Sequence, residues 1–272
     1  MNDIRIALAV MHCPVNRTDE NLVRMAHWVG AAKKAGAEIV CFPEMNLTGY
    51  AIDSDVRRTA VEVPGALTEN LVALARKENV TILAGMTEID PRGRIFAVHL
   101  VVEPHGISGV YRKLHLGPPE TPLFSAGSDA PLFTARGLRF GIQLCYDTHF
   151  PELSTRMALD GADLIFMPHA SPNGSPAEKL TSWMRHLTAR AFDNGLFIAA
   201  CNQVGENGRG LDFPGVAVVI APSGEMIASN QQGQETLLVA DLKSRVLERV
   251  RGHRMRYFLP NRRPDVYKLG ET

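Results

Sequence analysis

The chain has 272 residues, of which 45% are hydrophobic and 21% are charged, and its 29 Lys and Arg are balanced by 29 Asp and Glu. This composition is typical of a globular protein with a sizeable apolar core, and it argues against a disordered chain. Because the formal net charge is zero, no overall electrostatic attraction to nucleic acid or to an anionic membrane surface is expected. We therefore expect a small-molecule partner, with no nucleic-acid or membrane partner.

The secondary structure expected from the sequence alternates between strands and helices, as in β-α-β units. In chain order, strands are predicted at 4–11, 37–42 and 80–86, as a pair within 95–112 that turns at 104–106, at 138–144, 164–167 and 196–201, and on both sides of the turn 222–225. Helices are predicted at 16–34, 67–77, 151–160 and 178–193. Thr18 or Asn16 is expected to cap the first of these helices.

Two segments of the chain are similar to each other. Residues 36–43 (GAEIVCFP) and residues 161–168 (GADLIFMP) each combine a helix end, a strand and a terminal proline. Two copies are too few for a solenoid, but they predict two similar halves, an α/β fold with two packed sheets and helices outside. Glu44 and His169 each follow the strand of their copy, at the strand ends where open α/β sheets bind ligands.

The cysteines bear on both compartment and chemistry. The four of them show no C-x-x-C spacing, and the apolar run 4–11 is too short for a membrane span and lacks a positively charged leader. We expect a cytoplasmic location. Cys145, in GIQLCYDTHFPELS, lies where a strand stops, and Pro151 and Glu152 then signal a helix start. Unpaired N–H groups at such a corner would favour a thiolate, yet free cysteines are commonly small core residues, so position alone leaves both roles open.

A thiol needs a nearby base or cation to react at neutral pH. Glu44 lies at the end of an apolar strand, where a carboxylate is costly unless it is paired or used. Lys113 also ends a strand, and the Pro-rich loop that follows, 117–122, is rigid enough to fold over a pocket. Both residues have the alternative interpretation of ordinary solvated charges.

Three motifs together resemble a known family. The first motif is CFPE, which ends at Glu44, together with LTGY, which ends at Tyr50. The second is YRKLHL, which contains Lys113. The third is LCYD, which contains Cys145 and is followed by FPE. In this order, and spread over most of the chain, they resemble the nitrilase superfamily of carbon–nitrogen hydrolases. The resemblance implies a four-layer αββα sandwich, with Glu44 as general base, Cys145 as nucleophile and Lys113 as the cation that supports the tetrahedral intermediate. Glu120 matches a second glutamate, with which many amidase members position the substrate or orient the lysine.

The residues around the nucleophile bear on the substrate. Thr148 and His149 stand where hydrolases of N-carbamoyl amino acids place arginines, which disfavours a substrate with a free α-carboxylate. Tyr146 and Asp147 stand where nitrile-hydrolysing members tend to have Trp and Glu, which favours amides over nitriles. The segment 168–176 (PHASPNGSP) resembles the N-carbamoylputrescine amidase branch.

The sequence also suggests which side chains line the substrate pocket, and it argues against a metal site, a cofactor site and a phosphate-binding loop. The predicted substrate-binding residues are Tyr50, His115, Tyr146, His149 and His169, of which His115 and His149 fit a structural role equally well. The histidines and cysteines show no metal-ligand spacing, so we expect no metal site and no cofactor. The glycine-rich loop 205–210 lacks the Lys-Ser/Thr of a phosphate-binding loop.

Together these features predict a cofactor-free thiol hydrolase. It would cleave the C–N bond of a small linear carboxamide or N-carbamoyl amine through a cysteine thioester and release ammonia. A nitrilase acting on a small nitrile, an acyl transferase that uses the same thioester, and a catalytically silent ligand-binding scaffold remain open. Residues 1–252 are expected to form the hydrolase domain, and residues 253–272 an arm that, by the same resemblance, packs across a neighbouring subunit of a homodimer or a higher homo-oligomer.

Overall fold

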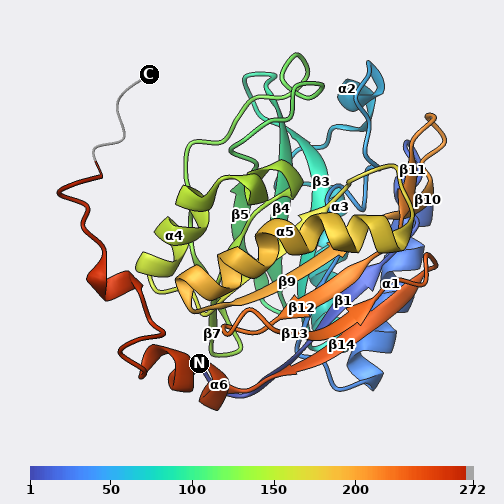
Figure 1. The fold of residues 1–272 in the computed structure, drawn as a ribbon. Helices are drawn as coiled ribbons and strands as arrows, with labels where there is room; N and C mark the ends of the chain where they lie inside the picture. The colour runs from blue at the N-terminus through green and yellow to red at the C-terminus, as the bar shows by residue number, and fades with distance from the viewer. Residues whose placement is uncertain (268–272) are drawn as a thin grey trace.

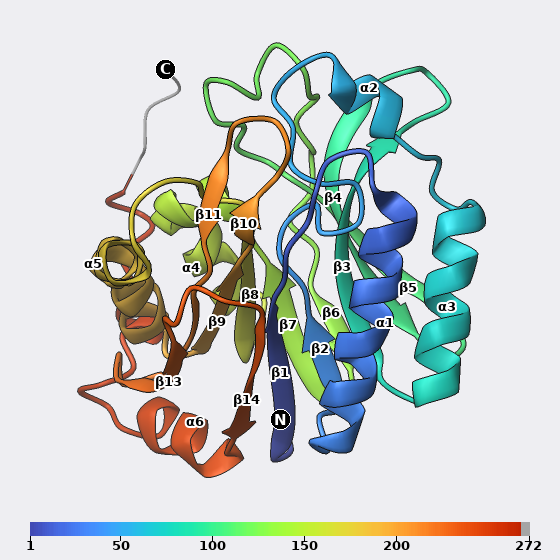
Figure 2. The same cartoon turned by 90° about the vertical axis from the view of Figure 1, so that its right-hand side faces the viewer.

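Two six-stranded sheets lie face to face, with helices on both outer sides, in the computed structural model, which describes residues 1–267 (Figures 1 and 2). This arrangement is the predicted four-layer αββα sandwich. Within the described residues, no helix is long and apolar enough to cross a membrane.

The first sheet has the strand order β14-β1-β2-β3-β4-β5. Its strands are β1 (Ile4–Val10), β2 (Ile39–Cys41), β3 (Thr81–Ile89), β4 (Ile95–Glu103), β5 (Gly106–Arg112) and β14 (Thr236–Leu242). The first three are parallel, and β4, β5 and β14 each join by antiparallel pairing. Helices α1 (Thr18–Lys34) and α3 (Ala66–Glu78) cover its outer face (Figure 2).

The second sheet has the order β13-β12-β9-β8-β7-β6. Its strands are β6 (Phe133–Ala135), β7 (Leu138–Ile142), β8 (Leu164–His169), β9 (Phe197–Asn202), β12 (Ala217–Ile220) and β13 (Met226–Asn230). Strands β7, β8 and β9 are parallel, and helices α4 (Pro151–Leu159) and α5 (Pro176–Asn194) cover the outer face (Figure 2). The remaining elements are α2 (Asp55–Thr59), the hairpin β10 (Val204–Glu206) and β11 (Asp212–Pro214), α6 (Ser244–Arg251), and the 3₁₀ helices η1 (Cys145–His149) and η2 (Leu259–Asn261).

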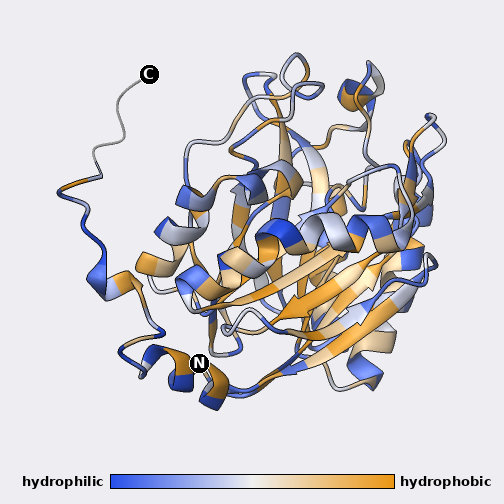
Figure 3. Cartoon of the chain, viewed as in Figure 1, coloured by the Kyte–Doolittle hydropathy of each residue, from blue (hydrophilic) through white to orange (hydrophobic). Residues whose placement is uncertain are grey.

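Strand β1 shows how the sequence builds this sandwich. Ile6 and Leu8 belong to the apolar cluster between the sheets, whereas Ala7 and Ala9 belong to the cluster under α1 and α3. Side chains alternate across a strand, so a strand that is covered on both faces must be apolar throughout. Figure 3 shows the apolar strands enclosed by helices whose outward faces are hydrophilic.

The internal similarity corresponds to equivalent positions in the two sheets. Strand β2 lies between two parallel neighbours in one sheet, as β8 does in the other. Gly36 and Gly161, which begin the two similar segments, follow α1 and α4 with φ angles of +79° and +96°. Residues with a side chain rarely adopt this conformation, so glycine is favoured where each helix ends.

Several local expectations were wrong or incomplete. Helix α1 has Arg17 at its N-cap with no side-chain capping hydrogen bond, so neither Thr18 nor Asn16 caps it. The strand expected at 37–42 is shorter, because only Ile39–Cys41 pairs with neighbours. The sequence predicted none of the elements α2, β6, β10, β11, β14 and α6. Most of them are short, and β14 is defined by pairing with β1 at the other end of the chain, which local periodicity cannot reveal.

Candidate active site

Strand ends from both sheets bring the predicted catalytic residues together. Glu44 follows β2, Lys113 directly follows β5, and Cys145 begins the turn η1 after β7. The Lys113 ammonium lies 2.8 Å from Glu44 Oε1 and 2.7 Å from Glu120 Oε1. Glu44, Lys113 and Glu120 are only 0%, 1% and 3% exposed, whereas Cys145 is partly exposed. One cation is therefore shared by two buried carboxylates.

Charge and burial shift the pKa values of this group. Burial alone disfavours the Lys113 charge, but the Glu44 and Glu120 carboxylates more than compensate and raise the pKa of Lys113 above its usual value. Burial raises the pKa of Glu44 to about 7, an effect that Lys113 opposes and Glu120 reinforces. Glu44 can therefore gain or lose a proton near neutral pH, as a general acid–base group must.

The Glu44 carboxylate is also held by the opposite half of the sandwich. Its Oε2 accepts a hydrogen bond from the Ala170 backbone N–H at 3.0 Å, directly after β8. Gln203, after β9, donates from Nε2 to the Glu44 carbonyl oxygen at 2.7 Å. The two positions that match in the internal similarity, residues 44 and 169, thus lie next to each other across the two sheets.

Glu120 reaches the cluster, which the sequence left open because of the prolines around it. Its Oε1 accepts from Tyr50 Oη at 3.0 Å as well as from Lys113, and its Oε2 accepts from the Gly117 backbone N–H at 2.7 Å. Each carboxylate oxygen therefore has a defined donor. Tyr50, expected to line the pocket, is mostly buried and donates its hydroxyl hydrogen to Glu120.

Cys145 occupies a strained corner. Its φ angle is +43°, in the left-handed region, which costs a residue with a side chain about 1–2 kcal/mol. Pro151 begins α4 after the turn, as the sequence predicted. Burial and the Glu44 charge raise the pKa of the Cys145 thiol to about 12, against opposing effects of Lys113 and the Ala170 N–H. Burial and the nearby carboxylates thus outweigh the cation and the backbone amide, and they oppose the tendency of such a corner to favour a thiolate.

Asp147 is a site residue whose role the sequence analysis missed. The side chain is 0% exposed and accepts hydrogen bonds from Tyr111 Oη, the Leu144 N–H, and both the N–H and Nδ1 of His115 at 2.8–2.9 Å. It therefore joins the loop after Lys113 to the nucleophile turn. The only available signal was an acidic residue in a largely apolar strand-to-helix segment, since its partners are distant in sequence.

The histidines predicted to line the pocket have different environments. His115 is bound to Asp147, and its ring stacks on Phe150 with centroids 3.8 Å apart. His169 is buried, and its Nδ1–H donates a hydrogen bond to the Met167 carbonyl oxygen at 2.7 Å. The centroid of its ring lies 4.2 Å from that of Trp183.

Tyr146 and His149 are the exposed side chains of the nucleophile turn. Their ring centroids lie 5.7 Å apart, and the His149 ring stacks on His186 of α5 at 4.6 Å. Burial lowers the pKa of both His149 and His186, and nearby Arg190 adds to this effect. The surface beside Cys145 is therefore formed by aromatic and uncharged imidazole rings. Among residues 1–267, no group of three or more His, Cys, Asp or Glu side chains is arranged to hold a metal ion.

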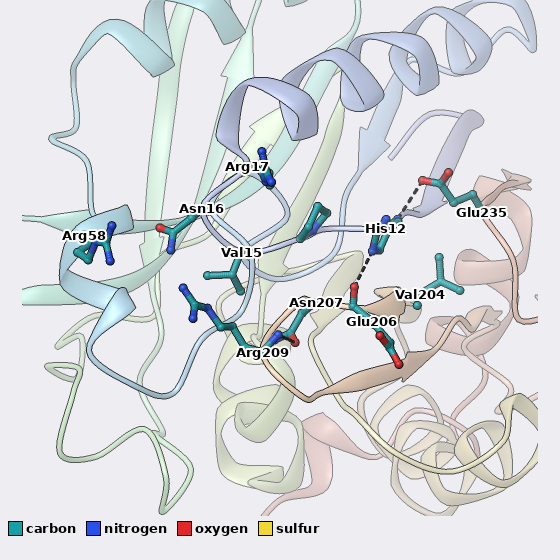
Figure 4. Close-up of a pocket in the computed structure, with 13 residues that line it drawn as sticks. His12, Val15, Asn16, Arg17, Arg58, Val204, Glu206, Asn207, Arg209 and Glu235 are labelled. Atoms are coloured by element: carbon teal, nitrogen blue, oxygen red, sulfur yellow. Dashed lines mark hydrogen bonds between the residues drawn. The ribbon is translucent and has the colours of Figure 1, made fainter.

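A separate surface cleft of about 930 Å³ lies at the hairpin β10–β11 (Figure 4). Its wall includes Arg17, Arg58 and Arg209, and none of the four predicted catalytic residues lines it. Asn207, which lines the cleft, donates from Nδ2 to the Tyr50 carbonyl oxygen at 2.8 Å. The glycine-rich loop 205–210 thus forms part of this cleft, not part of the catalytic cluster.

Comparison with known proteins is consistent with this geometry. A nitrilase from Pyrococcus abyssi is 29% identical over 269 residues, which cover 97% of this chain and 99% of the relative. The omega-amidase YafV of Escherichia coli K12 is 30% identical over 218 residues, or 79% of this chain and 81% of the relative. The crystal structure of an amidase from Nesterenkonia sp. superposes with a TM-score of 0.85 at 25% identity and covers 97% of this chain and 95% of that one.

The chain also matches a family model over most of its length. Residues 5–251 match the model described as carbon-nitrogen hydrolase, from within β1 to the end of α6. The matched segment includes Glu44, Lys113, Glu120 and Cys145, which the fold brings to one place. This chain therefore belongs to the carbon–nitrogen hydrolases of the nitrilase superfamily.

Proposed function

We propose that this protein is a cofactor-free thiol amidase that hydrolyses a small linear carboxamide or N-carbamoyl amine. The observation that carries the proposal is the Lys113 ammonium, bound by Glu44 and Glu120 at 2.8 and 2.7 Å beside the partly exposed Cys145. Relatives also support an amide substrate, since one is named an omega-amidase and the Nesterenkonia sp. AN1 amidase has been solved in complex with acrylamide.

In the first half of the reaction, Cys145 Sγ attacks the amide carbonyl carbon. The thiol pKa of about 12 lies far above the Glu44 pKa of about 7, so a free thiolate would be rare. Glu44 therefore accepts the thiol proton as the sulfur–carbon bond forms. The Lys113 ammonium and the Tyr146 backbone N–H are the donors proposed for the oxyanion of the tetrahedral intermediate.

In the second half, protonated Glu44 returns its proton to the leaving nitrogen, and ammonia departs as the C–N bond breaks. The acyl group remains on Cys145 as a thioester. Glu44, again a carboxylate, then removes a proton from water, which attacks the thioester carbonyl and releases the acid and the free thiol. Glu120 and Tyr50 keep the lysine ammonium in place through the contacts of 2.7 and 3.0 Å.

Ammonia release from a panel of short aliphatic amides, N-carbamoyl amines and nitriles tests this function. Turnover of amides or carbamoyl amines that disappears in Cys145→Ala and Glu44→Gln is the expected result. Mass spectrometry of the quenched enzyme should detect an acyl adduct on Cys145. No turnover of any amide or carbamoyl amine, together with no adduct, would overturn the proposal.

Nitrile hydrolysis is the second candidate, favoured by the name of the Pyrococcus abyssi relative. It uses the same thiol and base, and the nitrile arm of the panel distinguishes it. An acyl transferase would also form the thioester but would pass the acyl group to an added amine or hydroxylamine faster than to water. Measuring the acceptor dependence of product formation separates transfer from hydrolysis.

The proposed assembly is a homodimer, with residues 1–252 as the hydrolase domain and residues 253–272 as a docking arm, of which the last five residues lie outside the described part of the chain. Large apolar side chains are exposed on α4, α5 and the arm, among them Leu159 (49%), Phe192 (43%) and Met255 (78%). Such a surface is typical of an interface. Light scattering on the full chain and on a chain ending at residue 252 should show a dimer and a monomer, respectively. A monomeric full chain would contradict this assembly.

A further inference from the structure

Helix α5 contacts the nucleophile turn through a buried arginine. Arg190 is 8% exposed, and its guanidinium donates from Nε to the Thr148 carbonyl oxygen at 3.2 Å and from Nη2 to the His149 carbonyl oxygen at 3.0 Å. These are two consecutive carbonyls at the end of η1, the turn that begins with Cys145. A planar guanidinium can hold two acceptors at once, which a single ammonium cannot do in the same geometry.

The turn needs external support because its first residue is strained. Cys145 has a φ angle of +43°, and such conformations persist only where the surrounding structure imposes them. One constraint is local, since Thr148 Oγ1 donates to the Cys145 carbonyl oxygen at 2.7 Å. Thr148 therefore accepts a hydrogen bond from Arg190 at its carbonyl oxygen and donates one from its hydroxyl group to the Cys145 carbonyl oxygen.

A second residue of α5 contacts the same threonine. His186 lies one turn before Arg190 on the helix, and its Nε2 is 3.2 Å from Thr148 Oγ1. Residues four apart share a helix face, so one face of α5 presents both groups to the turn. Because Thr148 Oγ1 already donates to Cys145, it accepts from His186, which requires the Nε2–H tautomer.

Helix α5 is well suited to act as a fixed support. Ser175 and Glu178 form a capping box at its start, and Gly195, with a φ angle of +57°, ends it. Asn194 Nδ2 bonds to the Arg190 carbonyl oxygen at 2.9 Å near its end. Buried Trp183 and Leu187 anchor the helix in the core. The position of Arg190 on this helix is therefore fixed, and its guanidinium can hold the carbonyl groups of Thr148 and His149 in place.

We propose that Arg190 is a positioning residue for the nucleophile. By binding the carbonyls of Thr148 and His149, it holds the turn so that Cys145 Sγ stays aligned with Glu44 and the substrate carbonyl. It touches no reacting atom and acts only through the turn. The inference rests on the proposed thiol chemistry, and it differs from a purely structural role because it predicts a loss in catalytic rate per folded molecule.

The experiment compares Arg190→Ala and Arg190→Lys with Arg156→Ala. Arg156 lies on α4 directly after the turn, and its only described ion pair is with Asp160 on the surface, so its removal is a control for the loss of an arginine close to the site. For each variant, kcat and KM are measured on the best amide of the panel, with the folded fraction from circular dichroism. The rate of Cys145 alkylation by iodoacetamide at pH 8, located by peptide mapping, gives a readout that needs no turnover.

We expect kcat per folded molecule to fall about 10- to 100-fold in Arg190→Ala, with KM changed less than about threefold, since small misplacements of reacting groups have effects of this size. Arg190→Lys should fall between this variant and the wild type, and Arg156→Ala should match the wild type. An unchanged kcat per folded molecule in Arg190→Ala, an effect confined to KM, or the same fall in Arg156→Ala would overturn the inference.

If Arg190→Ala does not fold, Arg190→Lys and Thr148→Val test the same connection in a double-mutant cycle. Both act on one turn, so their effects on kcat should be non-additive, and additive effects would contradict the inference. If the wild type turns over no amide, the proposed function fails separately. The alkylation rate then decides, because slower labelling of Cys145 in Arg190→Lys supports a positioning role and an unchanged rate refutes it.

Discussion

The Glu44 carboxylate and the Lys113 ammonium lie 2.8 Å apart, although their strands β2 and β5 are not neighbours in the sheet. The same ammonium lies 2.7 Å from Glu120. The cluster thus contains two carboxylates and one cation. Burial, reinforced by Glu120 and opposed by Lys113, raises the pKa of Glu44 to about 7, so Glu44 can accept a proton near neutral pH while the lysine remains charged. The predictions below depend on this arrangement.

Replacement of Lys113 by Met should destabilise the protein strongly. It leaves two buried carboxylates without their cation, and breaking a buried pair in this way costs about 3–5 kcal/mol. In the variant, the folded-state pKa of Glu44 rises further above its unfolded value because the opposing effect of Lys113 is lost, so the folded state binds extra protons and is stabilised as the pH falls. Urea unfolding should therefore show a larger loss at pH 8 than at pH 5. A loss equal at both pH values would contradict the charge argument.

The activity should depend on the ionisation of Glu44. Its pKa is raised to about 7, and the base must be deprotonated, so kcat/KM should fall about tenfold for each pH unit below 7. Glu120 contributes to this rise in pKa, so Glu120→Gln should move the acid limb to lower pH even though it also lowers the rate. A pH–rate profile of both enzymes measures this, and a limb that stays in place or moves upward would exclude the proposed coupling.

Cys145 should be the cysteine that reacts in the folded protein. Cys13, Cys41 and Cys201 are only 0–1% exposed, whereas Cys145 is partly exposed. Titration with a thiol reagent should label one cysteine rapidly in the native state and four in denaturant. Because the thiol pKa is about 12, labelling at pH 8 relies on Glu44 as the proton acceptor. In Glu44→Gln, the loss of this acceptor should outweigh the lower thiol pKa that follows from removing the Glu44 charge, so labelling should slow. Equal labelling rates in the two proteins would show that Glu44 does not act on the thiol.

Asp147→Asn should destabilise the protein and lower its activity. The buried carboxylate accepts four hydrogen bonds. In the variant, the NH2 group of the Asn side chain replaces one carboxylate oxygen and faces groups that are themselves hydrogen-bond donors. Leaving a buried donor unsatisfied costs about 1–3 kcal/mol, and the loop after Lys113 would lose its attachment to the nucleophile turn. Thermal unfolding and kcat measure both effects. Asp160→Asn, which removes the carboxylate of an exposed ion pair at the C-terminal end of α4, is the matched control and should change neither.

Much of the fold was predictable because its signals are local. Continuous apolar runs such as Ile4–Val10 identify strands that are covered on both faces, and Gly36 and Gly161 identify two equivalent helix ends. The motifs around Glu44, Lys113 and Cys145 also place these residues at strand ends, where the structure finds them.

Other features depend on partners that no local pattern names. Strand β14 exists by pairing with β1, more than 200 residues away along the chain, as residues 4 and 242 face each other in the register. Asp147 and Arg190 look like ordinary charged residues in the sequence, yet both are buried and bind the nucleophile turn and its neighbours. Their roles follow from packing between elements, which the sequence does not display.

The sequence by itself predicted the class of fold and placed Glu44, Lys113 and Cys145 at strand ends, because periodicity and turn residues are local properties. The roles proposed for these three residues came from the family resemblance of the motifs around them. Only the tertiary structure decided the protonation of the site. Burial and the nearby Glu44 and Glu120 carboxylates raise the pKa of Cys145 to about 12 against the opposing effect of Lys113, whereas the position of the cysteine in the sequence left its role open. Desolvation and Coulomb energies depend on separations in space, and these arise only when the two sheets pack together.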